Sequence, residues 1–333
     1  MKKKMNISMV HRLVTLSILI LLMLILAIYS PHYRTFSNFV NVLRQSALTL
    51  IIASAATMLM ISGGMDLSPA GVMALVAVVV AKAASSGVPL PAAIALGLCL
   101  SAAAGALSGV LVTFANVPPM IATMGVWYVT KGLAYVLSES APIVRGLPDN
   151  YAWINSFVGK IPLLIIIAAL VFAVFYILLN FTLLGKHAYA IGGNKETARL
   201  SGVKVKGVTV LLYVLAALMS GLAGVLQSSR ICSGDPNFST NGMEFDVIVA
   251  IVVGGTSLMG GRGSLIGTFI GVMILSNLSN GMNLLGLGNV YQIIVQGIVL
   301  ILAVVLDLTL KGSGINLRGI KNGICKLIGK LKS

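Results

Sequence analysis

The sequence predicts an all-α polytopic membrane protein with about ten transmembrane helices, some of them short or broken, and with both termini in the cytoplasm. Composition is the first reason, because 58% of the 333 residues are hydrophobic, 9% are charged, and the mean hydropathy is +1.01. A soluble domain carries about 25% charged residues, so this composition excludes a soluble enzyme and a disordered chain. The other two reasons are the recurrence of apolar runs and the gathering of basic residues between them and at both ends.

The apolar runs approach the length that a membrane requires. A hydrocarbon core about 30 Å thick is crossed by about 20 helical residues, and open strands would leave backbone amides unsatisfied in lipid. The first run is followed by Pro31 and His32 rather than by a small-residue cleavage site, so we expect an uncleaved helix. The expected spans are residues 13–29, 47–62, 68–84, 88–114, 119–138, 161–179, 208–226, 247–259, 265–283 and 290–310.

Basic residues predict the orientation and the domain organisation. They concentrate in residues 1–12, in the loop 185–207 and in the tail 311–333, and the positive-inside rule places all three in the cytoplasm. Ten spans satisfy this arrangement, because six of them precede the loop and four follow it. We therefore expect a basic N-terminus, one membrane domain over 13–310 that includes the cytoplasmic loop, and a basic tail.

The first break in the apolar pattern runs from Gly63 to Pro69. Ser68 followed by Pro69 is typical of a helix N-cap and first helical position, and Asp66 complements the positive end of that helix. Asp66 either only caps this helix or faces a polar path through the protein, since an acid exposed to lipid is costly. The turn at Gly63-Gly64 has a faint echo at Gly260-Gly261, and both turns are expected on the cytoplasmic side.

The second break, residues 254–264, contains repeated glycines after a short apolar stretch. This pattern predicts a broken helix with close packing through small residues. The same composition occurs in phosphate-binding loops, but the Gly-x-x-x-x-Gly-Lys-Ser/Thr pattern is absent, so no nucleotide site is expected. Small residues over 97–109 and 220–224 also predict close helix packing.

Two further positions have alternative interpretations. Lys131 lies within an apolar run, where it either extends toward the membrane surface or faces a polar interior. In the basic loop, residues 195–201 either form a solvated loop or a short helix capped by Asn194 and ended by Gly202. Such a helix would suit docking into a groove on a partner.

The sequence offers little support for a catalytic site or a metal site on this chain. The three histidines lie outside the apolar runs and cannot activate an intramembrane serine, and the three cysteines are too scattered for a metal site or a disulfide framework. We expect no catalytic residue and no metal ligand on this chain. The net charge of +15 is explained by cytoplasmic loops, so nucleic-acid binding is not expected.

Several motifs in order resemble the permease subunits of ribose-type ATP-binding-cassette (ABC) sugar importers, over about Ser46 to Asp307. Three local departures, at Pro69-Ala70-Gly71, at Ser279 and in a longer loop over 235–241, bear on solute identity and pore chemistry. The motifs that carry the resemblance are Gly64-Met65-Asp66-Leu67-Ser68, Ala190-Ile191-Gly192-Gly193-Asn194, Arg199-Leu200-Ser201-Gly202-Val203, Gly242-Met243-Glu244-Phe245-Asp246-Val247-Ile248-Val249-Ala250, Gly254-Gly255-Thr256-Ser257-Leu258-Met259-Gly260-Gly261-Arg262-Gly263 and Asn280-Gly281-Met282-Asn283-Leu284-Leu285-Gly286.

The resemblance implies a multi-pass subunit of the bacterial cytoplasmic (inner) membrane that imports a monosaccharide or related small polar solute by alternating access. It implies a cytoplasmic ATPase that binds ATP and Mg, an extracytoplasmic solute-binding protein, and a second permease copy or sister permease. The translocation pathway is expected to include Asp66, Ser68, Lys131 and Asn280. The surface that couples to the ATPase is expected to comprise Gly192, Gly193, Asn194, Glu196, Arg199, Ser201 and Gly202.

Two other function classes remain open on the residues alone. An ion-coupled secondary transporter acting alone would require charged residues at mid-membrane, and a membrane-embedded enzyme would require a catalytic set near one interface. The sequence does not distinguish ribose from other pentoses, hexoses, polyols or sugar-like signals, nor a homodimer from a heterodimer of permeases.

Overall fold

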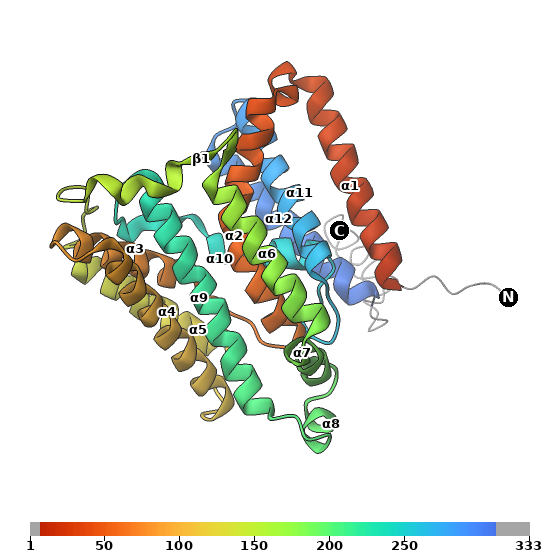
Figure 1. Cartoon of the computed structure of the whole chain (residues 1–333). Helices are drawn as coiled ribbons and strands as arrows, with labels where there is room; N and C mark the ends of the chain where they lie inside the picture. Colours follow the sequence, from red (N-terminus) through yellow and green to blue (C-terminus); the bar gives the residue numbers. More distant parts are fainter. Residues whose placement is uncertain (1–6, 311–333) are drawn as a thin grey trace, which may run out of the picture.

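The computed structural model describes residues 7–310, and the fold is almost entirely helical (Figure 1). Residues 1–6 of the expected basic N-terminus 1–12 and the whole expected tail 311–333 lie outside the described residues. The α-helices are α1 (Ile7–Tyr29), α2 (Phe36–Ile61), α3 (Pro69–Ser85), α4 (Leu90–Thr113), α5 (Pro119–Leu137), α6 (Leu163–Phe181), α7 (Leu183–Gly193), α8 (Lys195–Leu200), α9 (Val205–Ile231), α10 (Met243–Val253), α11 (Leu265–Leu284) and α12 (Asn289–Leu310).

Short elements connect some of these helices. Three 3-10 helices are η1 (Pro31–Arg34), η2 (Asp149–Asn155) and η3 (Pro236–Asn241). An antiparallel hairpin joins β1 (Phe157–Val158) to β2 (Ile161–Pro162), with Phe157 opposite Pro162.

The polytopic helical class is confirmed. Within the described chain, six helices are long and apolar enough to cross a membrane, namely α2, α4, α5, α6, α9 and α11. Shorter apolar helices cover Leu13–Tyr29, Pro69–Ser85 and Val290–Leu302. The expected bounds of α3, α5 and α11 hold to within one or two residues.

Three helices are longer than expected, and the first is α1, which begins at Ile7 rather than at 13. α2 begins at Phe36 rather than at 47, because the Thr35 hydroxyl accepts a hydrogen bond from the Asn38 backbone amide and caps it. α9 runs on to Ile231 rather than to 226. Polar residues interrupt the added stretches of α2 and α9, so an apolar window misses them although the backbone stays helical.

α10 corrects the expected span 247–259. It starts four residues earlier, at Met243, and ends at Val253, where the glycine-rich segment turns the chain back toward α11. The expected broken helix is therefore confirmed, with its break at Gly254 rather than at 259.

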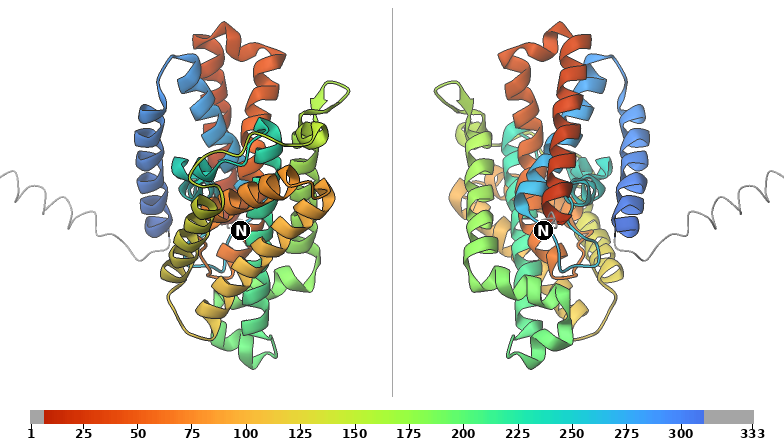
Figure 2. Two further views of the ribbon diagram at one scale, coloured as in Figure 1. Left: turned by 90° about the vertical axis from the view of Figure 1, so that its left-hand side faces the viewer. Right: turned by 90° about the vertical axis from the view of Figure 1, so that its right-hand side faces the viewer.

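The centre of the molecule is formed by α2 and α3. Both are buried along most of their length, α2 against α6, α9, α10 and α11, and α3 against α4, α5 and α9. α1 and α12 expose many apolar side chains, and Figure 2 shows α12 at the edge of the molecule. An apolar exposed face suits contact with lipid or with another membrane helix.

α4 and α9 pack through small residues, as the sequence predicts. A Cβ added to Gly105 would lie 2.6 Å from the Tyr213 carbonyl oxygen, and one added to Gly109 would lie 2.8 Å from Val210 Cα. The two backbones approach this closely because neither glycine has a side chain.

The two ends of the molecule differ in character. η1 and the β1–β2 hairpin lie at one end, and α8 lies at the other (Figure 1). α7 connects α8 to the C-terminal end of α6 and packs against α2 and α9.

Candidate functional site

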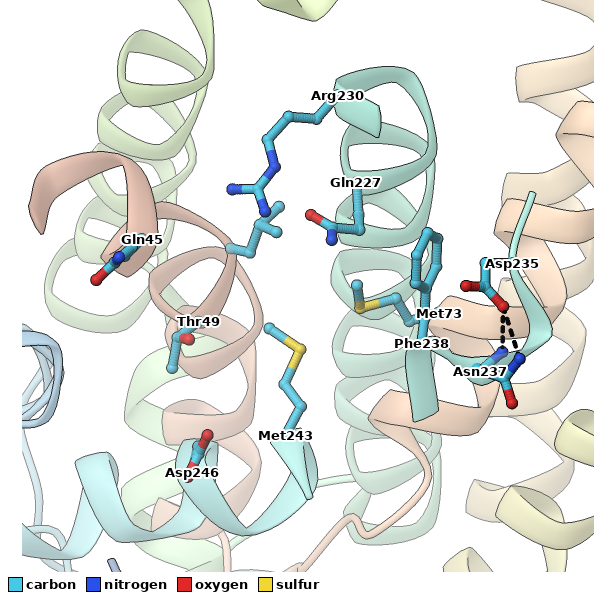
Figure 3. Close-up of a pocket in the computed structure, with 11 residues that line it drawn as sticks. Gln45, Thr49, Met73, Gln227, Arg230, Asp235, Asn237, Phe238, Met243 and Asp246 are labelled. Atoms are coloured by element: carbon cyan, nitrogen blue, oxygen red, sulfur yellow. Dashed lines mark hydrogen bonds between the residues drawn. The ribbon is translucent and has the colours of Figure 1, made fainter. Parts of the chain in front are cut away.

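A polar cavity of about 680 Å³ lies among five elements of the helical core. Its volume falls in the range of roughly 300–1,000 Å³ that is usual for sites of small-molecule ligands. Arg230 and Gln227 extend into it from the last turns of α9, far along that helix from α8 (Figure 3). The lining residues are Gln45, Leu48 and Thr49 of α2, Met73 of α3, Gln227 and Arg230 of α9, Asp235, Asn237 and Phe238 at η3, and Met243 and Asp246 of α10.

Three polar side chains in this cavity are left available to a ligand. The half-buried guanidinium group of Arg230 makes no hydrogen bond or ion pair with any described side chain. The buried Oε1 atom of Gln227 has no hydrogen-bond donor among the described residues. Asp246 reaches the cavity from α10. Because buried polar groups are normally paired, this combination indicates a site that a solute or water completes.

One wall of the cavity is held in place by hydrogen bonds. The Asp235 Oδ1 atom accepts from the Asn237 backbone amide at 2.8 Å and from Asn237 Nδ2 at 3.0 Å (Figure 3). The hydroxyl of Tyr135 on α5 donates to Asn237 Oδ1 at 2.8 Å. Phe238 therefore stands on a braced segment, and its ring offers the cavity an apolar face.

The arrangement suits a small polar solute. Arg230 supplies hydrogen-bond donors, Asp246 supplies acceptors, and the amides of Gln45 and Gln227 supply both. Apolar side chains from Met73, Met243 and Phe238 complete the lining, as they do in most small-molecule sites.

The structure places Asp66 and Ser68 at the start of α3, outside this cavity. Both are buried, and Asp66 Oδ1 accepts a hydrogen bond from the Ser68 backbone amide at 2.8 Å. Ser68 is the N-cap residue of α3 and Pro69 follows it in the first turn, as predicted, but the Ser68 side chain makes no capping hydrogen bond. Asp66 instead accepts from the backbone amide of the N-cap residue itself.

Lys131 also lies away from the cavity lining. Its Nζ atom is 4.7 Å from the centroid of the Trp127 ring, one turn back along α5. A cation over an aromatic face is stabilised by the ring quadrupole, so Lys131 has an apolar partner on its own helix.

Asn280 pairs with a second amide instead of facing the cavity. Asn38 Nδ2 donates to Asn280 Oδ1 at 3.1 Å, and Asn280 Nδ2 donates to Asn38 Oδ1 at 2.9 Å. Both side chains are buried, and the Tyr33 hydroxyl donates to Asn277 one turn earlier on α11. These amides fasten η1 and the start of α2 to α11.

This amide pair yields a stability prediction. Asn280→Leu leaves the buried Asn38 Oδ1 atom without its hydrogen-bond donor, which costs about 1–3 kcal/mol, whereas replacing both amides by leucine is close to neutral. We expect the double variant Asn38→Leu/Asn280→Leu to melt at a higher temperature than either single variant when the purified proteins are heated in detergent. A double variant that melts below both single variants would contradict the pairing.

The loop that was expected to couple to a partner forms two helices. α7 ends at Gly193, and α8 begins directly after Asn194, whose side chain accepts a hydrogen bond from the Thr197 backbone amide at 2.9 Å. Gly202 follows the end of α8 with φ +86°. The predicted short helix and both of its boundary residues are confirmed.

α8 presents charged and apolar side chains to solvent. Arg199 Nε lies 3.1 Å from Glu196 Oε1, and this hydrogen bond lowers the pKa of the Glu196 carboxyl, so that the pair stays ionised. Leu200 beside it is 75% exposed. Gly193, Ser201 and Gly202 are exposed as well, whereas Gly192 is turned toward α2.

Comparison with known proteins finds relatives of one kind. Residues 38–304 match a family model described as "Branched-chain amino acid transport system / permease component". The ribose import permease protein of Bacillus subtilis (strain 168) is 42% identical over 293 residues, which cover 87% of this chain and 90% of that protein. No solved structure matches the chain.

Two further relatives are permeases whose names give ribose and D-allose. The ribose import permease protein of Escherichia coli (strain K12) is 37% identical over 87% of this chain and 91% of its own length. The D-allose transport system permease protein of the same strain is 32% identical over 88% of this chain and 90% of its own length.

Proposed function

The chain belongs to the family of transport-system permease components, and from this premise we propose that it is the membrane subunit of a binding-protein-dependent ABC importer. It carries a monosaccharide or related small polar solute, similar to ribose, by alternating access. The solute-facing part of the path is the cavity between α2, α9 and α10. The observation that carries this proposal is the cavity itself, because it places unpaired polar groups inside an otherwise apolar helical protein.

The proposed topology has ten membrane elements with both termini in the cytoplasm. α8 then lies on the cytoplasmic side, and η1 and the β1–β2 hairpin face outward. The concentration of basic residues near α8 supports this orientation. It sets the Arg230 end of α9 toward the side from which an importer receives its solute.

Energy comes from a separate subunit in this proposal. A cytoplasmic ATPase binds ATP and Mg and docks on α8, while a solute-binding protein delivers the solute to the outer end. A second copy of the chain, or a sister permease, completes the transporter in the bacterial cytoplasmic membrane. ATP binding shifts the population between inward-open and outward-open states, because the ATPase dimer binds one of them better.

The docking surface is tested by reversing its charge and removing its apolar tip. We expect Arg199→Glu and Leu200→Asp each to reduce co-purification of the ATPase encoded with this chain by about tenfold or more, since a few central side chains carry most interface energy. Lys160→Glu makes the same charge reversal in the exposed β1–β2 turn and should retain the ATPase. Permease yield and melting temperature show whether each variant folds.

The same preparation separates the importer from its alternative. ATP-dependent uptake into vesicles that contain all subunits supports the importer. Uptake by the purified chain alone, driven by an ion gradient and with no ATPase bound, would instead establish a secondary transporter.

A further inference from the structure

Three chain segments far apart in sequence meet on the α8 side of the core. They are the end of α2 at Ile61–Gly64, the end of α7 at Gly192, and the turn at Gly260–Gly263 that follows α10. The Gly261 backbone amide donates a hydrogen bond to the Ile61 carbonyl oxygen at 2.8 Å. The Tyr189 hydroxyl, one turn before Gly192 on α7, donates to the Gly263 carbonyl oxygen at 2.9 Å.

This meeting point, which we call the glycine junction, brings backbone directly against backbone. A Cβ added to Gly192 would overlap the Ile61 carbonyl oxygen and would lie 2.5 Å from the Gly261 amide nitrogen. A Cβ added to Gly260 would lie 2.8 Å from the Gly63 nitrogen. By contrast, a Cβ added to Gly193, the next residue, would meet nothing within 4 Å. Of the two glycines that end α7, only Gly192 therefore makes this close approach.

On one side, the junction connects to α8. α7 and α8 are separated by Asn194 alone, which caps α8 and whose backbone amide is hydrogen bonded to Ala190 at the end of α7. Ala198 of α8 packs with Ile191 of α7 and Val205 at the start of α9. A partner that moves α8 will therefore move the end of α7 with it.

On the other side, the junction connects to three elements of the cavity. α2 ends in it and carries Gln45 and Thr49. The segment after Gly64 leads into α3, which carries Met73. The turn at Gly260 follows the end of α10, which carries Asp246.

We propose that the glycine junction transmits movement of α8 to the cavity, and that Gly192 is the positioning residue through which it does so. The inference rests on the proposed function, because it supposes a driving partner at α8. Backbone contacts suit this role, because they contain no side-chain rotamers that could absorb a displacement. Close-packed protein interiors have low compressibility and transmit strain. A shift of α7 is thus passed to the ends of α2 and α10 rather than taken up locally.

The test replaces Gly192 by alanine, which is compatible with a helix and adds only a methyl group at the contact. Gly125→Ala makes the same change on α5 at a helical position where a Cβ meets nothing within 4 Å. Both variants are reconstituted with the ATPase and solute-binding protein into vesicles, with ribose as the probe. The measured quantity is ribose imported per ATP hydrolysed.

For Gly192→Ala we expect the complex to assemble and hydrolyse ATP, with import per ATP lowered by about tenfold, a size common for coupling between distant sites. Gly125→Ala should keep the wild-type ratio. A purely structural role for Gly192 would lower import and hydrolysis together with protein yield and leave their ratio unchanged. That result would overturn the inference.

A second variant covers the case in which Gly192→Ala fails to fold. Tyr189→Phe removes the hydroxyl that donates to Gly263 and adds no bulk, so we expect import per ATP to fall by about threefold, in line with one neutral hydrogen bond. An unchanged ratio in this variant also overturns the inference. If the wild-type complex itself shows no ATP-dependent import of ribose or of a panel of other monosaccharides, the proposed function fails instead.

Discussion

Gly271→Val is expected to prevent the protein from accumulating in a folded form. Gly271 lies where α11 crosses α10, and a Cβ there would overlap the Ala250 carbonyl oxygen and lie 3.0 Å from the Gly254 amide nitrogen. The contact atoms belong to backbone, so no side chain can rotate away. Overpacking a core typically costs about 1–3 kcal/mol for small additions, and a β-branched group pressed against backbone exceeds that.

The matched control is Gly132→Val on α5, where a Cβ meets nothing within 4 Å. Glycine and valine differ little in helix propensity, so this control should change stability by less than about 0.5 kcal/mol. The measurement is the yield of monodisperse protein after size-exclusion chromatography in detergent, followed by thermal melting. Equal yields of the two variants would show that the α10–α11 crossing tolerates added volume.

At the glycine-rich break over residues 254–264, the sequence predicts the end of a helix but not the role of each glycine. Repeated glycines after a short apolar run predicted a broken helix, and α10 does end there. The pattern could not show which residue faces which neighbour. Gly254 and Gly267 both stand against backbone at the α10–α11 crossing, whereas Gly255 turns the chain with φ +89°. Those roles depend on how α11 returns past α10.

The similarity between the two glycine pairs also predicts local structure but not the contact between them. The turns at Gly63-Gly64 and at Gly260-Gly261 are alike in sequence, and the expected topology places both on the cytoplasmic side. Their contact joins residues almost two hundred positions apart and depends on α7 packing on both. The local sequence predicts that the chain turns at each glycine pair, but it does not identify which distant residues the turn will contact.

Boundaries were well predicted where the change of chemistry was sharp. Pro119 begins α5, and Asn194 and Gly202 enclose α8, because a proline or a cap acts within one turn. The predicted spans leave out the outer ends of α2 and α9, because polar residues interrupt the apolar pattern there. Three of these polar residues, Gln45, Gln227 and Arg230, line the cavity.

The cavity itself was not predicted for the same reason. The predicted span 208–226 ends at Leu226, which leaves Gln227 and Arg230 outside it. The available signal was helical continuity, because no glycine or proline interrupts the chain before Cys232. Instead, the pathway was assigned to Asp66, Ser68, Lys131 and Asn280, which are polar residues inside apolar runs. That assignment stays a prediction, although none of the four lines the cavity.

Arg230→Met is expected to abolish most solute uptake without harming the fold. Arg230 reaches the cavity with an unpaired, half-buried guanidinium group, and a partly desolvated charge without a partner is unfavourable. Methionine keeps an unbranched apolar stem and removes the charge, so the melting temperature should stay equal or rise. Hydrogen bonds that involve a charged group are worth about 1.5–3 kcal/mol, so uptake should fall by roughly 10- to 100-fold.

Lys131→Met is the informative comparison, since sequence reasoning favoured Lys131 and the structure favours Arg230. Lys131 rests on Trp127 and is absent from the cavity lining, so its variant should transport within about twofold of wild type, because the loss of one cation–π contact away from the cavity is a small effect. Initial rates of ribose uptake at saturating ATP measure both variants in the same vesicles.

If Lys131→Met is the inactive one, the solute passes along α5 rather than between α2, α9 and α10. If Arg230→Met melts earlier and transports normally, its guanidinium group stabilises the fold instead. The expected result is that Arg230→Met gives a more stable protein with little transport. It would mean that the Arg230 charge lowers the stability of the fold but is required for the solute to bind.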